Sequence, residues 1–169
     1  MSPIEIIENA FSRYEKPLIS YAREITGDLE SARDAVQETF LRLSKQDVAS
    51  LQERLAPWLF CVCRNCALDH QRKIVRFREE SIEEDEQITD QTPADQASNK
   101  DESQQLQKLI CRLPEKQREL LKLKFEAGLS YKEMAETMNM SVSHIGVTLH
   151  EAIQTLRKHT AHRSLNTAH

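Results

Sequence analysis

Residues 128–158 decide the fold and read GLSYKEMAETMNMSVSHIGVTLHEAIQTLRK. Ser130 followed by Glu133 is the pattern of a capping box, which predicts a helix over 131–138. The polar turn Asn139-Met140-Ser141 comes next, and apolar residues then recur at helical spacing in a longer helix. A short helix, a tight turn and a second helix with a polar outer face predict a helix-turn-helix, whose second helix enters the major groove of DNA.

Candidate contacts to duplex DNA lie on the outer side of this second helix and at its two ends. Hydroxyl and imidazole groups hydrogen-bond to base edges, valine makes apolar contacts, and cations bind phosphates. The candidates are Ser141, Ser143, His144, Val147, Thr148, His150, Arg157 and Lys158. Gly146 within this helix costs about 1 kcal/mol relative to Ala, which close approach to DNA or to a neighbouring helix would explain. An ordinary helical hairpin is the alternative.

The N-terminal half reads as helices. Apolar residues recur at intervals of three and four over 11–25 and again over 29–43, which predicts two amphipathic helices. Gly27 suits a left-handed C-cap between them, and Asp28 suits the next N-cap. Pro57 suits the first turn of a third helix, which we expect to run to about Phe77. The whole pattern predicts an all-α fold.

The third helix combines aromatic and basic side chains. Unpaired bases stack on aromatic rings while Arg and Lys hold phosphates, so this helix is a candidate surface for separated DNA strands. Its candidate contacts are Trp58, Asn65, Asp69, Arg72, Lys73 and Arg76. The alternative is that Trp58 belongs to the core and that the arginines are merely solvated.

Composition excludes other classes. Three Gly and five Pro in 169 residues are too few for the turns of an all-β fold or for a Gly-rich phosphate loop. No apolar run approaches the roughly 18 residues of a membrane span, and no secretory signal is seen. The four Cys then indicate reduced thiols in the cytoplasm. No catalytic motif is recognised, so we expect no enzymatic activity and no cofactor.

A cluster of Cys61, Cys63 and Cys66 with His70 raises the question of a metal site. On one helix, Cys63, Cys66 and His70 share a face while Cys61 points away. Zinc sites usually combine ligands from a tight knuckle with ligands from elsewhere. We therefore interpret these Cys as small apolar residues and expect no bound metal.

The net charge of −4 conceals blocks of opposite sign. Residues 51–78 carry six Lys and Arg against two Asp and Glu, residues 79–102 carry one against ten, and residues 103–169 carry ten against six. The acidic block buries too little to offset its ordering entropy, so it is predicted to be a flexible linker, either solvated or lying in a positively charged channel of a partner. The expected organisation is a helical domain over 1–78, an acidic linker over 79–104, a helix-turn-helix domain over 105–160 and a disordered tail over 161–169.

Two stretches resemble a known family. Residues 28–42 (DLESARDAVQETFLR) and 57–73 (PWLFCVCRNCALDHQRK) resemble the sigma-2 domain of sigma-70 family factors, a small helical bundle. The stretch that begins LPEKQRELL at residues 113–121 and runs to residue 158 resembles their sigma-4 domain. The order, spacing and short length are similar to the extracytoplasmic-function (ECF) group. The resemblance covers about residues 8–160.

The resemblance implies a promoter-specificity subunit of bacterial RNA polymerase. The helix with Trp58 would recognise and melt the −10 element, and the second helix of the helix-turn-helix would read the −35 element as duplex. The implied partners are core RNA polymerase and promoter DNA, with an anti-sigma factor as a further candidate. The implied polymerase-binding face consists of Asp34, Gln37, Glu38 and Leu41.

The recognition helix departs from the family pattern. Where ECF factors usually carry several Arg and Lys, this chain has Gly146, Val147, Thr148, Glu151 and Gln154. That departure keeps open a sigma-like adaptor or antagonist that binds polymerase without initiating transcription. An ordinary helix-turn-helix repressor is a third interpretation, but it leaves the aromatic and basic helix unexplained.

Overall fold

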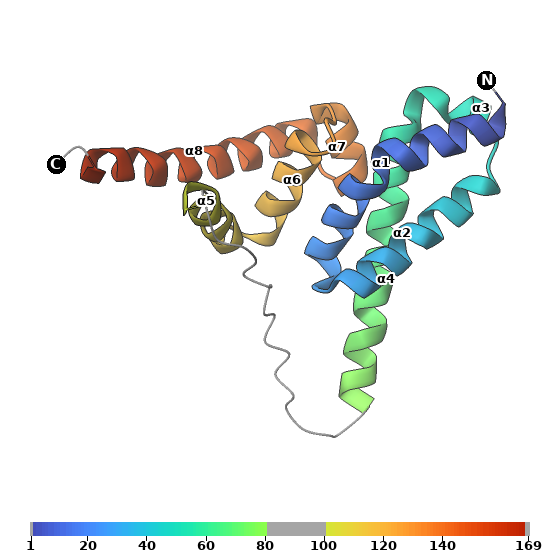
Figure 1. Cartoon of the computed structure of the whole chain (residues 1–169), viewed down its shortest axis with the longest axis horizontal. Coiled ribbons are helices and arrows are strands. Elements are labelled where there is room, and N and C mark those ends of the chain that lie inside the picture. Colours follow the sequence, from blue (N-terminus) through green and yellow to red (C-terminus); the bar gives the residue numbers. More distant parts are fainter. Residues whose placement is uncertain (1, 81–100, 168–169) are drawn as a thin grey trace.

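The computed structural model describes residues 2–80 and 101–167, and its elements within these two ranges are all helices (Figure 1). The first range holds α1 (Pro3–Thr26), α2 (Leu29–Ser44), α3 (Val48–Leu51), the short 3-10 helix η1 (Gln52–Arg54) and α4 (Leu55–Glu80). The second range holds α5 (Asp101–Arg112), α6 (Glu115–Phe125), α7 (Tyr131–Met138) and α8 (Val142–Thr167). The all-α prediction is confirmed. Among the described helices, none is long and apolar enough to span a membrane.

The predicted helix ends are confirmed by their caps. Gly27 closes α1 in the left-handed conformation, with φ of 85°, and the Asp28 side chain accepts a hydrogen bond from the backbone N–H of Ser31 at the start of α2. At α7, the Ser130 hydroxyl accepts from the N–H of Glu133, whose carboxylate accepts from the N–H of Ser130. These local signals fix the helix boundaries before any tertiary contact is made.

The N-terminal half packs α1, α2 and α4 around one apolar core. Leu18, Tyr21, Leu43 and Phe60 are fully buried there. The rings of Tyr21 and Phe60 meet edge to face, with centroids 5.7 Å apart. This core holds the first three turns of α4 rigidly, whereas the far end of the helix extends away from the bundle (Figure 1).

The C-terminal half packs α6, α7 and α8 around a second group of buried side chains. Leu123, Met134, Ile145 and Leu149 are its largest members. Ser141 caps α8 by accepting from the backbone N–H of His144, as the sequence predicts. The geometry of a short helix, a tight turn and a long second helix confirms the helix-turn-helix.

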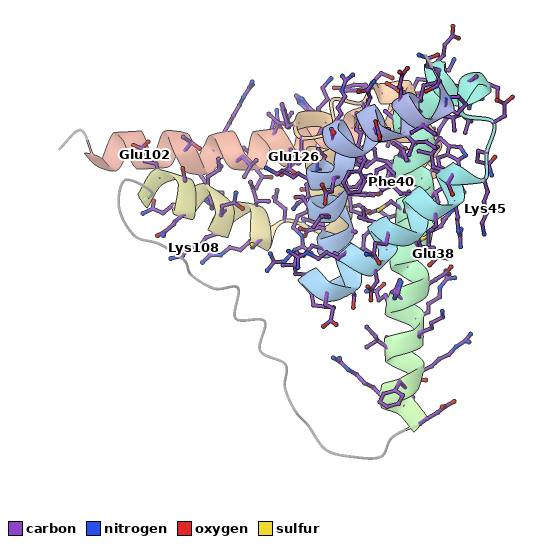
Figure 2. All side chains as sticks on the ribbon, turned by 45° about the vertical axis from the view of Figure 1, so that its right-hand side comes forward. Glu38, Phe40, Lys45, Glu102, Lys108 and Glu126 are labelled. Carbon is purple, nitrogen blue, oxygen red and sulfur yellow. The ribbon has the colours of Figure 1, made fainter. Side chains whose placement is uncertain are left out.

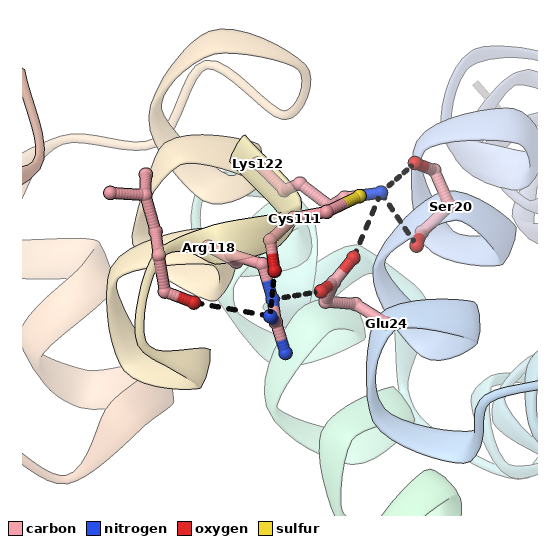
Figure 3. Close-up of polar contacts among 6 residues, drawn as sticks. Ser20, Glu24, Cys111, Arg118 and Lys122 are labelled. Atoms are coloured by element: carbon pink, nitrogen blue, oxygen red, sulfur yellow. Dashed lines mark hydrogen bonds and ion pairs between the residues drawn. The ribbon is translucent and has the colours of Figure 1, made fainter. Parts of the chain in front are cut away.

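The two halves contact each other where α4 packs against α7 and where α1 packs against α6, and at the second place polar side chains form a seam (Figure 3). Glu24 of α1 forms ion pairs with Arg118 and Lys122 of α6, at 2.5 and 3.6 Å. The Lys122 ammonium also donates to the Ser20 hydroxyl at 2.9 Å. Beside this seam, the buried Tyr21 hydroxyl donates to the sulfur of Met138 in α7 at 3.5 Å.

Two segments that are expected to be unstructured lie partly within helices. Residues 81–100 of the predicted 79–104 linker lie outside the described residues, while residues 79–80 end α4 and residues 101–104 begin α5. Residues 161–167 of the expected 161–169 tail continue α8, and residues 168–169 lie outside the described residues, so the expected disorder of the tail stays a prediction. No Gly or Pro interrupts that stretch, so the helix continues from the turn before it.

Candidate nucleic-acid interface

The sequence-predicted contacts on α4 share one side of the helix. At about 100° per residue, Trp58, Asn65, Asp69, Arg72, Lys73 and Arg76 fall within an arc of about 100°. We call these six residues the α4 stripe. Its members from Asn65 onward are exposed, and Asp69 pairs with Arg72 at 3.7 Å. From Asn65 to Arg76 the stripe therefore offers cations and hydrogen-bonding groups to solvent over about three turns.

Trp58 lies at the base of the stripe and is only partly exposed. Its side chain packs against the apolar core of the N-terminal half. Trp58 thus contributes to the core, as the alternative interpretation expects, while its contact with separated strands stays a prediction. A largely covered indole offers less area for base stacking than a free ring does.

The exposed side of α8 carries most of the predicted duplex contacts. Exposed residues at the N-terminal end of α8 are Ser141, Ser143, His144, Val147 and His150. Arg157 and Lys158 are exposed about three turns further along the helix. Between residues 141 and 151 the helix has no Lys or Arg, so groups that hydrogen-bond or make apolar contacts dominate this surface.

Thr148 differs from its predicted position. Thr148 was expected on the DNA side, but it is 9% exposed, because it lies between Ile145 and Ala152 on the buried side of α8. Val142, the first residue of α8, is 49% exposed, because the buried stripe of this helix begins one turn later at Ile145. Thr148 is accordingly a poor candidate for base contact.

The implied polymerase-binding face lies on α2. Asp34, Gln37 and Leu41 are exposed, and Leu41 keeps 62% of its surface open. Glu38, labelled in Figure 2, forms an ion pair at 2.7 Å with Arg42 one turn later. The four residues form an exposed patch of mixed acidic and apolar character.

Comparisons with known proteins match both halves. The model of sigma-70 region 2 matches residues 10–77, and the model of sigma-70 region 4 matches residues 103–156. The ECF RNA polymerase sigma factor SigM of Bacillus subtilis is 31% identical over 89% of this chain and 93% of its own length. This chain belongs to the ECF group of the sigma-70 family.

Other relatives agree with this assignment. The RNA polymerase sigma factor YlaC of Bacillus subtilis is 27% identical over 90% of each chain. Among solved structures, the sigma factor RpoE of Bartonella quintana, crystallised with the anti-sigma factor NepR, matches with a TM-score of 0.60 and 22% identity. That match covers 89% of this chain and 94% of the other, and it supports the fold.

Cys63 and Cys66 of this ECF sigma factor are placed for packing, whereas Cys61 is partly buried and Cys111 is exposed. Cys63 and Cys66 are buried, and burial raises the pKa of the Cys63 thiol to about 12. The Cys63 thiol lies 3.9 Å from the carbonyl oxygen of Leu18. Within residues 2–80 and 101–167, no group of three His, Cys, Asp or Glu side chains is arranged to hold a metal ion.

Sequence reasoning missed a buried charge pair at the seam. Arg64 of α4 and Glu119 of α6 form an ion pair at 3.8 Å, and Glu119 is 3% exposed. Burial raises the pKa of Glu119 to about 7, against the opposing attraction of Arg64. The pair joins residues far apart in sequence, so no local sequence pattern predicts it. Arg64 therefore points away from the α4 stripe.

Proposed function

We propose that this ECF sigma factor binds core RNA polymerase and directs promoter-specific transcription initiation. The N-terminal half, residues 1–78, docks on the polymerase and melts the −10 element. The helix-turn-helix half, residues 105–160, reads the −35 element as duplex. In this role it acts in the cytoplasm as a binding and positioning subunit, with no reaction of its own.

One observation carries this proposal. A single chain combines a surface suited to separated strands with one suited to duplex DNA, in the order of sigma-70 regions 2 and 4. Cations along the α4 stripe suit the phosphates of single strands. Exposed polar groups on α8 suit base edges in the major groove. A repressor needs only the second surface.

The polymerase contact is assigned to the exposed patch on α2. The patch combines polar and acidic side chains with one exposed apolar side chain, Leu41; its other members are Asp34, Gln37 and Glu38. Protein–protein interfaces commonly have such an apolar centre within a polar rim. This patch lies on α2 and the α4 stripe on α4, so polymerase and DNA have separate helices to bind.

The test is reconstitution. Purified chain is added to bacterial core RNA polymerase with genomic DNA fragments, and the start points of run-off transcripts are mapped. Initiation at a defined set of promoters is the expected result. Core binding without specific initiation would instead establish the adaptor or antagonist, and absence of core binding would refute both.

A further inference from the structure

Four ion pairs join the two halves of the chain, and we call them the seam pairs. They are Glu24 with Arg118, Glu24 with Lys122, Arg64 with Glu119, and Arg54 with Glu136. The other ion pairs within residues 2–80 and 101–167 are local, each between residues three or four positions apart on one helix. Polar interfaces between domains resemble transient protein–protein interfaces, so the two halves are able to separate.

The closed arrangement limits how far apart the two candidate DNA surfaces lie. α4 packs against α7, and α7 packs against α8. At about 39 Å for α4, about 12 Å for α7 and about 10 Å for one helix diameter, the far end of α4 lies within about 60 Å of the start of α8. The −10 and −35 elements are about 25 base pairs apart by position, or about 85 Å along the duplex. One closed chain therefore cannot reach both elements.

Glu119 is the seam residue whose charge changes near neutral pH. It is 3% exposed, and burial raises its pKa to about 7. The charged and titratable groups that face it come from α1, α4 and α6; they are Tyr21, Glu24, Arg64, Glu115 and Lys116. The Arg64 Nε atom lies 3.8 Å from Glu119 Oε1, too far for a hydrogen bond, so the attraction of Arg64 offsets only part of the cost of burial.

We propose that the seam is a pH-dependent conformational switch, in which ionisation of Glu119 opens the closed chain and frees its halves to reach both promoter elements. Acidic conditions close the chain, and alkaline conditions open it. The opening is a property of the free chain, and only its effect on promoter engagement rests on the proposed function.

The direction of the switch follows from when Glu119 meets water. In the closed chain α1 and α4 cover its side chain, whereas separation of the halves returns it to water and to the ordinary carboxyl pKa of 4.5. The closed chain therefore keeps this proton up to about pH 7, after the open chain has released it. From pH 6 to pH 8, the ratio of closed to open chain should fall about tenfold.

Energy transfer within the free full-length chain measures the opening. The donor is Trp58, the single Trp of the chain, and the acceptor is a dye on Cys111 of α5 in the other half. Cys111 is exposed, whereas Cys63 and Cys66 are buried. Cys61→Ala removes the remaining accessible thiol. We expect strong transfer at pH 6 and weaker transfer at pH 8, because the halves separate.

Three variants distinguish the switch from other effects of pH. Glu119→Gln mimics the protonated side chain and should hold the chain closed at both pH values. Glu24→Lys places like charges opposite Arg118 and Lys122 and should open the chain at both. Glu8→Lys, the same charge change at an exposed position of α1, is the matched control and should respond to pH as the wild type does. Circular dichroism checks that each variant keeps its helices.

Assembly with core RNA polymerase on a mapped promoter links the opening to function. At pH 8, Glu119→Gln should assemble about tenfold more weakly than the wild type, because a closed chain must first open. Glu24→Lys should assemble at least as tightly as the wild type, because its halves are already separated.

Two sets of outcomes would overturn the inference. Energy transfer that is the same at pH 6 and pH 8 in the wild type, or that changes equally in Glu119→Gln, would overturn the switch itself. Normal assembly of Glu119→Gln at pH 8 would overturn its effect on promoter engagement. If the wild type binds no core polymerase while its energy transfer still changes with pH, the proposed function fails and the opening stands.

Discussion

The α4 stripe and the exposed side of α8 are both candidate DNA surfaces, but they differ in charge. The stripe presents Arg72, Lys73 and Arg76 within five residues. The exposed side of α8 presents Ser143, His144 and other uncharged or acidic groups, with no Lys or Arg between residues 141 and 151. One chain therefore carries a surface dominated by cations and a surface dominated by hydrogen-bonding groups.

This difference matches the two forms of DNA. Separated strands are flexible and lack ordered base edges, so binding relies on phosphate attraction and stacking. Duplex DNA displays fixed donors and acceptors in its major groove, so a helix can read it with few charges. We infer that salt and charge govern the contacts of α4, whereas base sequence governs those of α8.

The largest expected effect comes from removing the charge of the stripe. Arg72→Gln/Lys73→Gln/Arg76→Gln should reduce binding of the chain with core polymerase to a pre-opened bubble by on the order of a hundredfold, at about 1 kcal/mol for each exposed charge contact. Arg157→Gln/Lys158→Gln, which removes exposed cations of α8, is the matched control. Fluorescence anisotropy of the labelled bubble measures both. If both variants lost the same affinity for the bubble, the α4 stripe and the exposed side of α8 would not differ in how they bind DNA.

A smaller effect, on stability, is expected at Glu119, the partner of Arg64, which is the α4 cation that faces the seam. Because burial raises the pKa of Glu119 from 4.5 to about 7, the folded chain holds a proton there that the unfolded chain releases. The free energy of unfolding therefore falls as pH rises from about 4.5 to about 7, because the unfolded chain gives up this proton before the folded chain does. Glu119→Gln mimics the protonated form and should be more stable than wild type at pH 8 by on the order of 2 kcal/mol, with little difference near pH 5.

Thermal unfolding at the two pH values measures this effect. The groups that face Glu119 are Arg64, Glu115, Glu24 and Lys116. Glu126→Gln, at the exposed C-cap of the same helix and absent from the groups that shift the pKa of Glu119, is the control. If Glu119→Gln is the less stable protein at pH 8, then the ion pair with Arg64 outweighs the cost of burying the charge.

A further variant tests the exposed side of α8. His144→Ala should weaken binding to upstream duplex by about tenfold, the lower part of the range for one specific base contact, and should leave binding to a pre-opened bubble intact. Thr148→Ala should leave duplex binding nearly unchanged, since Thr148 is buried. A loss at Thr148 comparable to that at His144 would place the DNA on a different side of α8.

The smallest expected effect concerns Gly146. A Cβ built at this position would meet only the Tyr131 ring, at 3.8 Å, which is ordinary van der Waals contact. Packing within the chain therefore does not require glycine here. Gly146→Ala should raise the free energy of unfolding by about 1 kcal/mol, measured by thermal denaturation. Unchanged or lower stability would mean that the helix is constrained in another way.

Local signals in the sequence predict much of this fold. The caps at Gly27, Asp28, Ser130 and Ser141 use groups within four residues of each other, so a single sequence contains all the information. Helical periodicity likewise places the α4 stripe on one side of the helix. These are the features on which the sequence and the structure agree.

Long-range contacts explain what the sequence did not predict. The pairing of Arg64 with Glu119 and the partial burial of Trp58 depend on how separate helices pack. The prediction for Thr148 was wrong because this residue borders the buried stripe of α8. A rotation of α8 about its axis by a few tens of degrees decides whether such a residue faces the core or the solvent. The exposure of Phe77 is visible only once the core is seen to end at Ala67.

The most direct test of the difference between α4 and α8 is the salt dependence of promoter binding by the chain assembled with core polymerase. Removing three phosphate contacts of single-stranded DNA should reduce the slope of log K against log salt by about 2. We predict that decrease for Arg72→Gln/Lys73→Gln/Arg76→Gln and an unchanged slope, at lower affinity, for His144→Ala. Equal changes of slope in the two variants, or none in the first, would contradict the account.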